Sequence, residues 1–305
     1  MLNLLKVKEN YKNKMEKKFV SIGKETIAYL DIGEGPVVLM VHGNMSSSVY
    51  YEPLITRIKD KYRCIAVDLR GFGDSSYNNR FDTLEELADD VNLFTEALGI
   101  DSYYLVGWSN GGGVSLRLCA KYPDKVKKFF DIEGAGLKGY PLYKKENFKS
   151  TGEPYANKEE MASDPMQVAP ILAIFEKGDA AMMTSIWDAT IYTVNKPTRE
   201  QNDLWMSETL KQRNLVDLDW ALATLNMSDE YTPYGKGDGS IKNIKCPVAL
   251  TMADRDIIVP DYMVLDNYNA LGSLATLLPY ENCGHSPMVD CPDRLAKDVV
   301  EFFSK

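Results

Sequence analysis

Histidine is scarce in this chain: only His42 and His285 occur among 305 residues. Any chemistry that needs an imidazole as a base near neutral pH therefore has two candidates. Cysteine is also sparse, with five residues at scattered positions and no Cys-x-x-Cys pair. This pattern argues against a disulfide framework and against a zinc site. We expect reduced thiols in a cytoplasmic protein, without a metal ion or other cofactor.

Long hydrophobic runs and an excess of basic charge are both missing. No segment approaches the ~20 consecutive apolar residues that a membrane span needs. The apolar opening Met1-Leu2-Asn3-Leu4-Leu5 is interrupted at once by charged residues, so it does not form a signal-peptide core. The formal net charge is −9, which argues against nucleic acid as a partner. We expect a small-molecule ligand, and the sequence leaves the oligomeric state open.

The lysines gather at the start of the chain. They are Lys6, Lys8, Lys12, Lys14, Lys17 and Lys18. Such a run could attract a membrane surface, but a frayed and solvated terminus is the commoner case. We therefore predict a flexible N-terminal arm over residues 1–16.

Apolar runs alternate with helical patterns along much of the chain. Runs over residues 36–41, 63–67, 103–106, 128–132, 248–252 and 274–278 read as strands buried on both faces of a parallel sheet. Between them, Thr83-Leu84-Glu85-Glu86 has the form of a capping box and opens a helix with apolar residues at helical spacing. The alternation predicts an α/β fold with helices on both faces of the sheet.

Two parts depart from this alternation. Residues 19–22 and 26–32 predict a hairpin that adds antiparallel edge strands to the sheet. Residues 139–242 contain three of the four tryptophans and six methionines, and no buried strand interrupts them. We predict that this stretch is an inserted helical cap, here called the insertion, with helices over residues 203–215 and 217–225. The α/β core would then comprise residues 17–138 and 243–305.

Gly107-Trp108-Ser109-Asn110-Gly111 directly follows the predicted strand at residues 103–106. A Gly-x-Ser-x-Gly segment at such a place can turn sharply into a helix and raise the serine hydroxyl on a strained corner. The glycines allow neighbouring chain to pass where a Cβ would not fit. Ser109 is therefore the candidate nucleophile.

A serine nucleophile needs a base, and the base needs an orienting acid. His285 follows the last predicted strand, so it should reach the same carboxyl edge of the sheet as Ser109. His42 is followed at once by Gly43 and is expected to brace its own loop. For the acid, Asp256 lies in the loop beyond the predicted strand at 248–252. Asp254 is the alternative, although Arg255 could neutralise it.

The negative charge of an acyl-transfer intermediate needs preorganised N–H donors. The backbone amide of Asn110, at the start of the helix after Ser109, is one predicted donor. The backbone amide of Asn44, in the loop after the strand at 36–41, is the other. Trp108 is adjacent to the nucleophile and could line a substrate pocket, or it could equally pack behind the corner.

These motifs together resemble the α/β-hydrolase fold family of serine hydrolases. The resemblance covers most of residues 17–136 and 243–305. It rests on His42-Gly43-Asn44, on Asp68–Ser75, on the Gly107–Gly111 segment, on Asp256 and on Gly284-His285. The family order of serine, acid and histidine is met by Ser109, Asp256 and His285. The resemblance implies a structural turn at Asp68–Ser75, without catalytic roles for its carboxylates.

The resemblance also narrows the chemistry. Relatives that open epoxides or displace halide use an aspartate nucleophile, which Ser109 argues against. We expect a capped esterase or lactonase that cleaves an apolar small-molecule ester or lactone through an acyl-enzyme. A carbon–carbon bond hydrolase and a cofactor-free haloperoxidase share the same triad and stay as alternatives. A slowly turning-over ligand receptor and a non-catalytic binding protein are alternatives of another class.

Overall fold

The computed structural model describes residues 15–305. The predicted N-terminal arm, residues 1–16, therefore lies outside the described residues except for its last two positions. The strands of the main sheet are β1 (Lys18–Ile22), β2 (Glu25–Ile32), β3 (Val37–Val41), β4 (Arg63–Val67), β5 (Tyr103–Trp108), β6 (Val126–Ile132), β11 (Val248–Ala253) and β12 (Ala275–Tyr280).

Within the described residues these eight strands form one sheet in the order β1-β2-β4-β3-β5-β6-β11-β12. The pairs β1–β2 and β2–β4 are antiparallel, whereas β4, β3, β5, β6, β11 and β12 run parallel. The predicted α/β fold, with an antiparallel hairpin at the N-terminal edge, is confirmed. Since parallel neighbours end at the same edge, the loops after β3, β5, β11 and β12 lie together.

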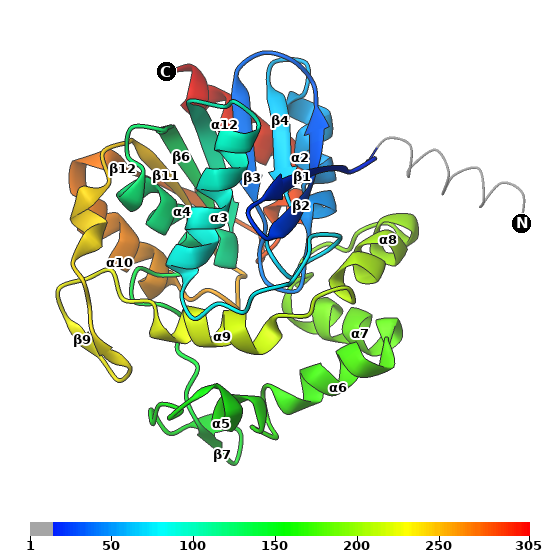
Figure 1. The fold of residues 1–305 in the computed structure, drawn as a ribbon, viewed down its shortest axis with the longest axis vertical. Coiled ribbons are helices and arrows are strands. Elements are labelled where there is room, and N and C mark those ends of the chain that lie inside the picture. Colours follow the sequence, from blue (N-terminus) through cyan, green and yellow to red (C-terminus); the bar gives the residue numbers. More distant parts are fainter. Residues whose placement is uncertain (1–14) are drawn as a thin grey trace, which may run out of the picture.

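Helices cover both faces of this sheet (Figure 1). The regular elements of the core outside the sheet are η1 (Ser48–Tyr51), α2 (Glu52–Ile58), α3 (Leu84–Ala97), α4 (Asn110–Lys121), η2 (Ser240–Asn243), α10 (Asp261–Leu271), η3 (Gly272–Leu274), α11 (Pro287–Asp290) and α12 (Pro292–Ser304). Apolar residues of α3, α4 and α10 share one hydrophobic cluster, and those of α2 and α12 share a second.

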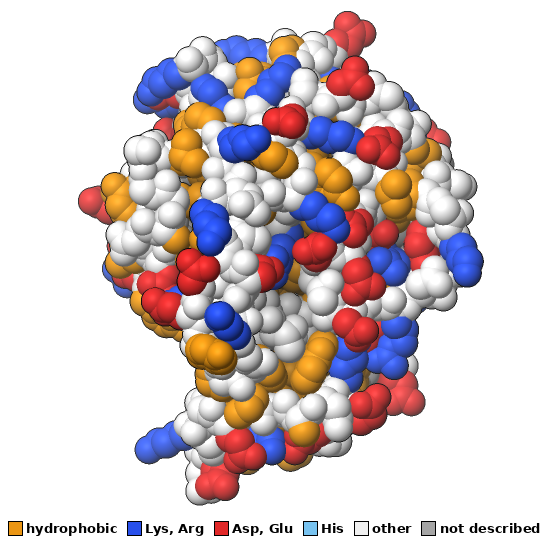
Figure 2. Space-filling view, turned by 60° about the vertical axis from the view of Figure 1, so that its left-hand side comes forward, with side chains coloured by type: hydrophobic (Ala, Val, Ile, Leu, Met, Phe, Trp, Pro, Cys, Tyr) orange, Lys and Arg blue, Asp and Glu red, His pale blue; other side chains and the backbone are white. Residues whose placement is uncertain are grey.

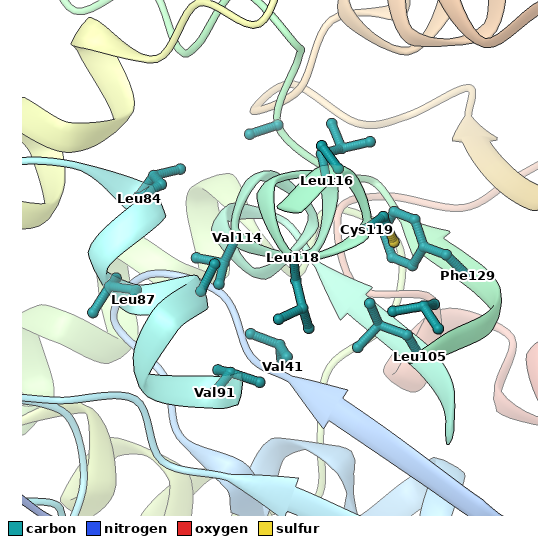
Figure 3. Close-up of a cluster of buried hydrophobic side chains, with 14 of the residues drawn as sticks. Val41, Leu84, Leu87, Val91, Leu105, Val114, Leu116, Leu118, Cys119 and Phe129 are labelled. Carbon is teal, nitrogen blue, oxygen red and sulfur yellow. The ribbon is translucent and has the colours of Figure 1, made fainter. Parts of the chain in front are cut away.

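The strands are apolar at successive positions because each face meets its own layer of helices. In β3, Leu39 and Val41 belong to the cluster under α3 and α4, whereas Val38 and Met40 belong to the cluster under α2 and α12. Figure 3 shows Val41 among the side chains of α3 and α4. The capping box predicted at Thr83 is present and starts α3.

The insertion lies between β6 and β11, in green and yellow in Figure 1. It contains α5 (Lys158–Ala162), α6 (Ala169–Lys177), α7 (Ala180–Thr190), α8 (Arg199–Thr209) and α9 (Leu215–Thr224). It also contains two short hairpins, β7 (Lys145–Glu146) with β8 (Lys149–Ser150) and β9 (Tyr231–Thr232) with β10 (Gly235–Lys236). In Figure 2 hydrophobic and charged side chains are interspersed over its surface, in the lower part of the molecule.

The inserted helical region was expected, but one of its helices was placed wrongly. The helix predicted over residues 203–215 ends at Thr209, because the next residues bind the core instead of continuing the helix. Arg213 N donates to Gly71 O at 2.9 Å, and Gln212 donates its side-chain amide to Asn44 Oδ1 at 2.9 Å. The boundaries 139 and 242 remain a prediction.

The prediction of a solvated lysine run is wrong for Lys17. Its ammonium bonds Asp68 (2.7 Å), Asp74 (2.9 Å) and Glu208 of α8, with only 7% of the side chain exposed. These partners lie 51 or more residues away in the chain, so a local lysine count could not reveal them. Lys18 is exposed as expected and pairs with Asp31. No helix in residues 15–305 is long and apolar enough to cross a membrane.

Candidate active site

Ser109 occupies the corner between β5 and α4. Its backbone has φ 56° and ψ −121°, a combination rarely adopted by residues with a side chain. Ser109 N donates to Ile132 O at 3.0 Å, and Ser109 O accepts from Ala135 N and from Gly112 N, both at 2.9 Å. The strain at Ser109 is thus maintained by the neighbouring strand β6 and the loop after it.

Glycine is required at the corner because other chain segments pass very close. A Cβ on Gly111 would lie 2.0 Å from Val41 O, and one on Gly107 would lie 2.7 Å from Gly111 O. On the other side, a Cβ on Gly43 would lie 3.0 Å from the Ser109 Cβ. The loop after β3 therefore runs directly beside the serine side chain.

His285 and Asp256 form a buried pair. Their Nδ1 and Oδ2 atoms are 2.7 Å apart, and the side chains are 2% and 1% exposed. Asp256 Oδ1 accepts the amides of Ile258 (2.7 Å) and Val259 (3.1 Å). Burial alone would raise the pKa of Asp256, but the charge of His285 and these hydrogen bonds outweigh it and hold the pKa below its usual range. Asp256 is therefore an ionised partner for the imidazole.

The alternative acid, Asp254, does not contact His285 in the structure. Its Oδ1 accepts the amide of Cys283 at 3.1 Å, and Arg255 lies 3.8 Å from its Oδ2. The side chain is 47% exposed. Asp254 thus stabilises the loop that precedes His285. Of the two carboxylates, only Asp256 contacts the imidazole.

The backbone amides of Asn44 and Asn110 are among those near Ser109 for which no hydrogen bond to a described residue is found. These are the two predicted oxyanion donors. The adjacent Met45 amide is engaged, since it donates to Asn44 Oδ1 (2.8 Å) and Gln212 Oε1 (3.0 Å). The amides of Asn44 and Asn110 are thus available to a ligand in the cavity, and their role as oxyanion donors stays a prediction.

His42 braces the loop that carries Asn44. Its Nε2 accepts from the Leu69 amide at 3.1 Å, and its Nδ1 lies 2.8 Å from Gly43 O. The side chain is fully buried, and burial lowers the pKa of His42 to about 4. It is therefore a neutral structural residue at physiological pH.

Ser109, His285, Asn44 and Asn110 line one cavity of about 280 Å³. Its apolar wall comes largely from the insertion, through Leu142, Val168, Ile186, Trp187, Ile191 and Leu222. The polar residues of the wall are Asn44, Ser109, Asn110, Tyr140, Gln167, Thr190, Asp219 and His285.

Trp108 both packs behind the corner and lines the cavity, the two alternatives that the sequence left open. Its ring is packed against Tyr50 and Trp187 with 1% exposure, and its Nε1 donates to His285 O at 2.8 Å. It also contributes to the cavity wall. Trp108 therefore holds the backbone of His285 while forming part of the pocket.

The sequence did not single out three polar residues around this site. Asp219, from α9, lines the cavity and accepts from Asn44 Nδ2 at 3.1 Å. Gln212 holds both Asn44 and Met45. Glu133, after β6, accepts from Thr251 Oγ1 at 2.6 Å, and burial together with the charge of Asp256 raises its pKa well above the usual range. No local pattern marks them, because each depends on how distant segments pack.

One group of carboxylates has the spacing to hold a metal ion within the described part of the chain: Asp68, Asp74 and Glu208. The Lys17 ammonium lies among them and bonds all three. Their charge is thus already balanced by a protein cation. Asp68 also accepts the amides of Ser48 (2.8 Å) and Asp74 (3.0 Å), which fits the structural turn that the resemblance implied.

Parts of the sequence are similar to those of known proteins. A family model described as alpha/beta hydrolase fold matches residues 36–149, which include Asn44, Ser109 and Asn110. Haloalkane dehalogenase 2 of Mycobacterium tuberculosis is 33% identical over 113 residues, covering 37% of this chain and 40% of that protein. The 2-(acetamidomethylene)succinate hydrolase of Mesorhizobium japonicum is 37% identical over 114 residues, covering 37% and 41%. The chain thus spans about two fifths of the curated relatives that it matches.

The structural likeness extends over the whole fold. A thermophilic esterase from Thermogutta terrifontis superposes with a TM-score of 0.71 at 18% identity, covering 95% of this chain and 98% of that one. The sheet order, the strained serine after β5 and the matched family model all point the same way. The chain has the α/β-hydrolase fold, and its residues 36–149 match that family's model.

Proposed function

We propose that this protein is a serine hydrolase that cleaves a carboxylic ester or lactone, with Ser109 as nucleophile, His285 as base and Asp256 as the orienting acid. The observation that carries the proposal is the buried His285–Asp256 pair, 2.7 Å apart, whose imidazole lines the same cavity as the strained Ser109. A buried imidazole fixed by a carboxylate on Nδ1 presents Nε2 as the proton acceptor.

In the first half of the reaction His285 takes the hydroxyl proton of Ser109, and the serine oxygen attacks the carbonyl carbon. The amides of Asn44 and Asn110 donate to the resulting oxyanion. Each such donor is worth about 3 kcal/mol of transition-state stabilisation in serine hydrolases. His285 then gives its proton to the leaving alcohol, and the acyl group stays on Ser109.

In the second half His285 takes a proton from water, and the resulting hydroxide attacks the acyl-enzyme. The same two amides stabilise the second oxyanion. Ser109 leaves with the proton from His285, and the carboxylic acid is released. Asp256 remains ionised throughout, because its role is to stabilise the imidazolium that forms in both halves.

A serine nucleophile does not suit halide displacement or epoxide opening. Attack of a serine oxygen on a carbon that bears halide or an epoxide oxygen would leave an ether, which has no carbonyl for water to attack. A carboxylate nucleophile would instead leave a hydrolysable ester. Ser109 therefore supports carbonyl chemistry, although a haloalkane dehalogenase is among the similar proteins.

The pocket supports an apolar substrate held by the insertion, which we propose acts as a cap over residues 139–242. Most of its wall is aliphatic or aromatic, and of the described residues that line it none is lysine or arginine. Such a wall offers no partner for a substrate with several carboxylates. Cytoplasmic action is part of the proposal and rests on the five cysteines, all of which are thiols.

The proposal is tested with a panel of esters and lactones of graded acyl length, assayed with wild type and Ser109→Ala. We expect hydrolysis of medium-length apolar esters, and a loss of about 10⁴-fold or more in kcat for Ser109→Ala. Carbon–carbon substrates such as vinylogous diketones are included in the same panel. Hydrolysis of those alone, or equal rates for wild type and Ser109→Ala on esters, would refute the proposal.

A further inference from the structure

Asp219 is the one carboxylate among the described residues that line the cavity. It lies on α9 of the insertion, and its side chain is buried at the wall shared with Ser109 and His285. Burial raises the pKa of Asp219 to about 7, and the hydrogen bond from Asn44 only partly opposes that rise. A carboxylate in such a place is costly unless something pairs with it.

The protein supplies only part of that pairing. Asp219 Oδ1 accepts from Asn44 Nδ2 at 3.1 Å, whereas no described residue donates to Oδ2. Its neighbour on the same helix, Asp217, is by contrast fully paired, with Arg80 and Lys158 bonded to its Oδ1. Arg80 and Lys158 therefore neutralise Asp217 and do not pair with Asp219. Oδ2 of Asp219 has no donor among the described residues.

The surroundings contain no protein cation for Asp219. The other titratable groups of the cavity wall are Tyr140 and His285, and both have partners of their own. Tyr140 donates to Ile258 O at 2.9 Å, and His285 pairs with Asp256.

We propose that Asp219 is the specificity residue of this pocket and binds a protonated amino group on the substrate. This inference rests on the proposed ester or lactone hydrolysis. An ammonium satisfies Asp219 best, because it supplies both a positive charge and N–H donors to the free oxygen. It also favours ionisation of Asp219, so each group stabilises the charged form of the other.

Asp219 would then orient the substrate relative to the oxyanion site. Asn44 joins the two, since its side chain donates to Asp219 while its backbone amide is a predicted oxyanion donor. The insertion would therefore bind the ammonium end of the substrate, while the core reacts with its carbonyl group. The expected substrates are amino-acyl esters or amino-substituted lactones with an apolar linker.

The test compares two matched series of ethyl esters. One series carries a terminal ammonium at increasing distance from the carbonyl, and the other carries a methyl group in its place. At the best length we expect a higher kcat/KM for the amino ester. In Asp219→Asn, which keeps the acceptor for Asn44, the ratio of amino to methyl ester should fall about 30-fold. Asp203→Asn, an exposed residue of α8, is the control and should keep the wild-type ratio.

The pH dependence of that ratio separates the effect of Asp219 from that of His285. Titration of His285 changes kcat/KM for both esters by the same factor and therefore cancels in the ratio. As Asp219 ionises, the wild-type ratio should rise with pH through about 7, the pKa of Asp219. In Asp219→Asn it should stay flat. A ratio near one for every length, or one that Asp219→Asn leaves unchanged, would overturn the inference while ester hydrolysis stands.

Binding provides a readout that does not depend on turnover. Ser109→Ala is titrated with alkylammonium ions and with alcohols of the same chain length. We expect a lower Kd for the alkylammonium ions. Asp219→Asn in the Ser109→Ala background should remove the difference. Failure of every ester and lactone to react would refute the proposed function, whereas equal binding of both ligand types would refute the amino subsite.

Discussion

Replacement of Asp256 by asparagine should abolish most activity through a change of histidine tautomer. The amides of Ile258 and Val259 both donate to Oδ1 of Asp256. In Asp256→Asn these two donors fix the side-chain oxygen at that position. The new NH₂ group must then face Nδ1 of His285, which currently lies 2.7 Å from Oδ2.

A donor at that position forces Nδ1 to be the acceptor and places the ring proton on Nε2. That nitrogen can no longer take the proton of Ser109. Loss of the correct tautomer in a triad of this kind costs about 10⁴-fold in kcat, equivalent to about 5 kcal/mol. The buried charge of Asp256 is also lost, so the imidazolium that forms during the reaction has no counter-ion.

The assay is kcat on the best ester of the panel, with circular dichroism to confirm that the variant is folded. Asp254→Asn is the matched control, because it is two residues away and bonds Cys283 instead of His285. We expect less than about tenfold loss for it, as is typical of an exposed carboxylate. A greater loss in Asp254→Asn than in Asp256→Asn would refute the assignment of the acid.

Three further predictions concern stability. Lys17→Met leaves the buried carboxylates of Asp68 and Glu208 without their cation. The free energy of unfolding, measured in urea, should therefore fall by about 3–5 kcal/mol. A change below about 1 kcal/mol would contradict this prediction. Gly111→Ala places a Cβ 2.0 Å from Val41 O, and we expect a much lower Tm by calorimetry with loss of activity; a Tm near that of wild type would contradict the close approach. Because burial lowers the pKa of His42 to about 4, the unfolded chain binds a proton before the folded one does. Stability should therefore fall by about 3 kcal/mol between pH 6.5 and 4, and His42→Gln should flatten that slope in urea titrations; an unchanged slope would refute the cause.

Local sequence determined those parts of the site that lie at strand ends. Ser109, Asp256 and His285 each follow an apolar run, and parallel strands bring their carboxyl ends to one edge. The pairing of His285 with Asp256 was predictable for that reason. The choice between Asp256 and Asp254 rested on the same argument, since Asp254 follows β11 directly whereas Asp256 lies further into the loop.

The parts that local sequence did not determine depend on packing across long separations. Asp219 faces the cavity only because α9 lies against the loop of Asn44, 175 residues earlier. Lys17 is buried only because carboxylates of the core and of α8 converge on it. Helical periodicity shows which side of a helix is apolar, but it does not show which cavity a polar residue on that helix will reach.

The central claim is that Ser109 is the activated nucleophile, and covalent labelling tests it most directly. The protein is treated with a fluorophosphonate, digested, and analysed by mass spectrometry for the adduct. We predict a single adduct on Ser109, a labelling rate lowered by about 10³-fold or more in His285→Ala, and no adduct at that position in Ser109→Ala. Absence of labelling in the folded wild type, or an adduct on another residue that persists in Ser109→Ala, would contradict the account.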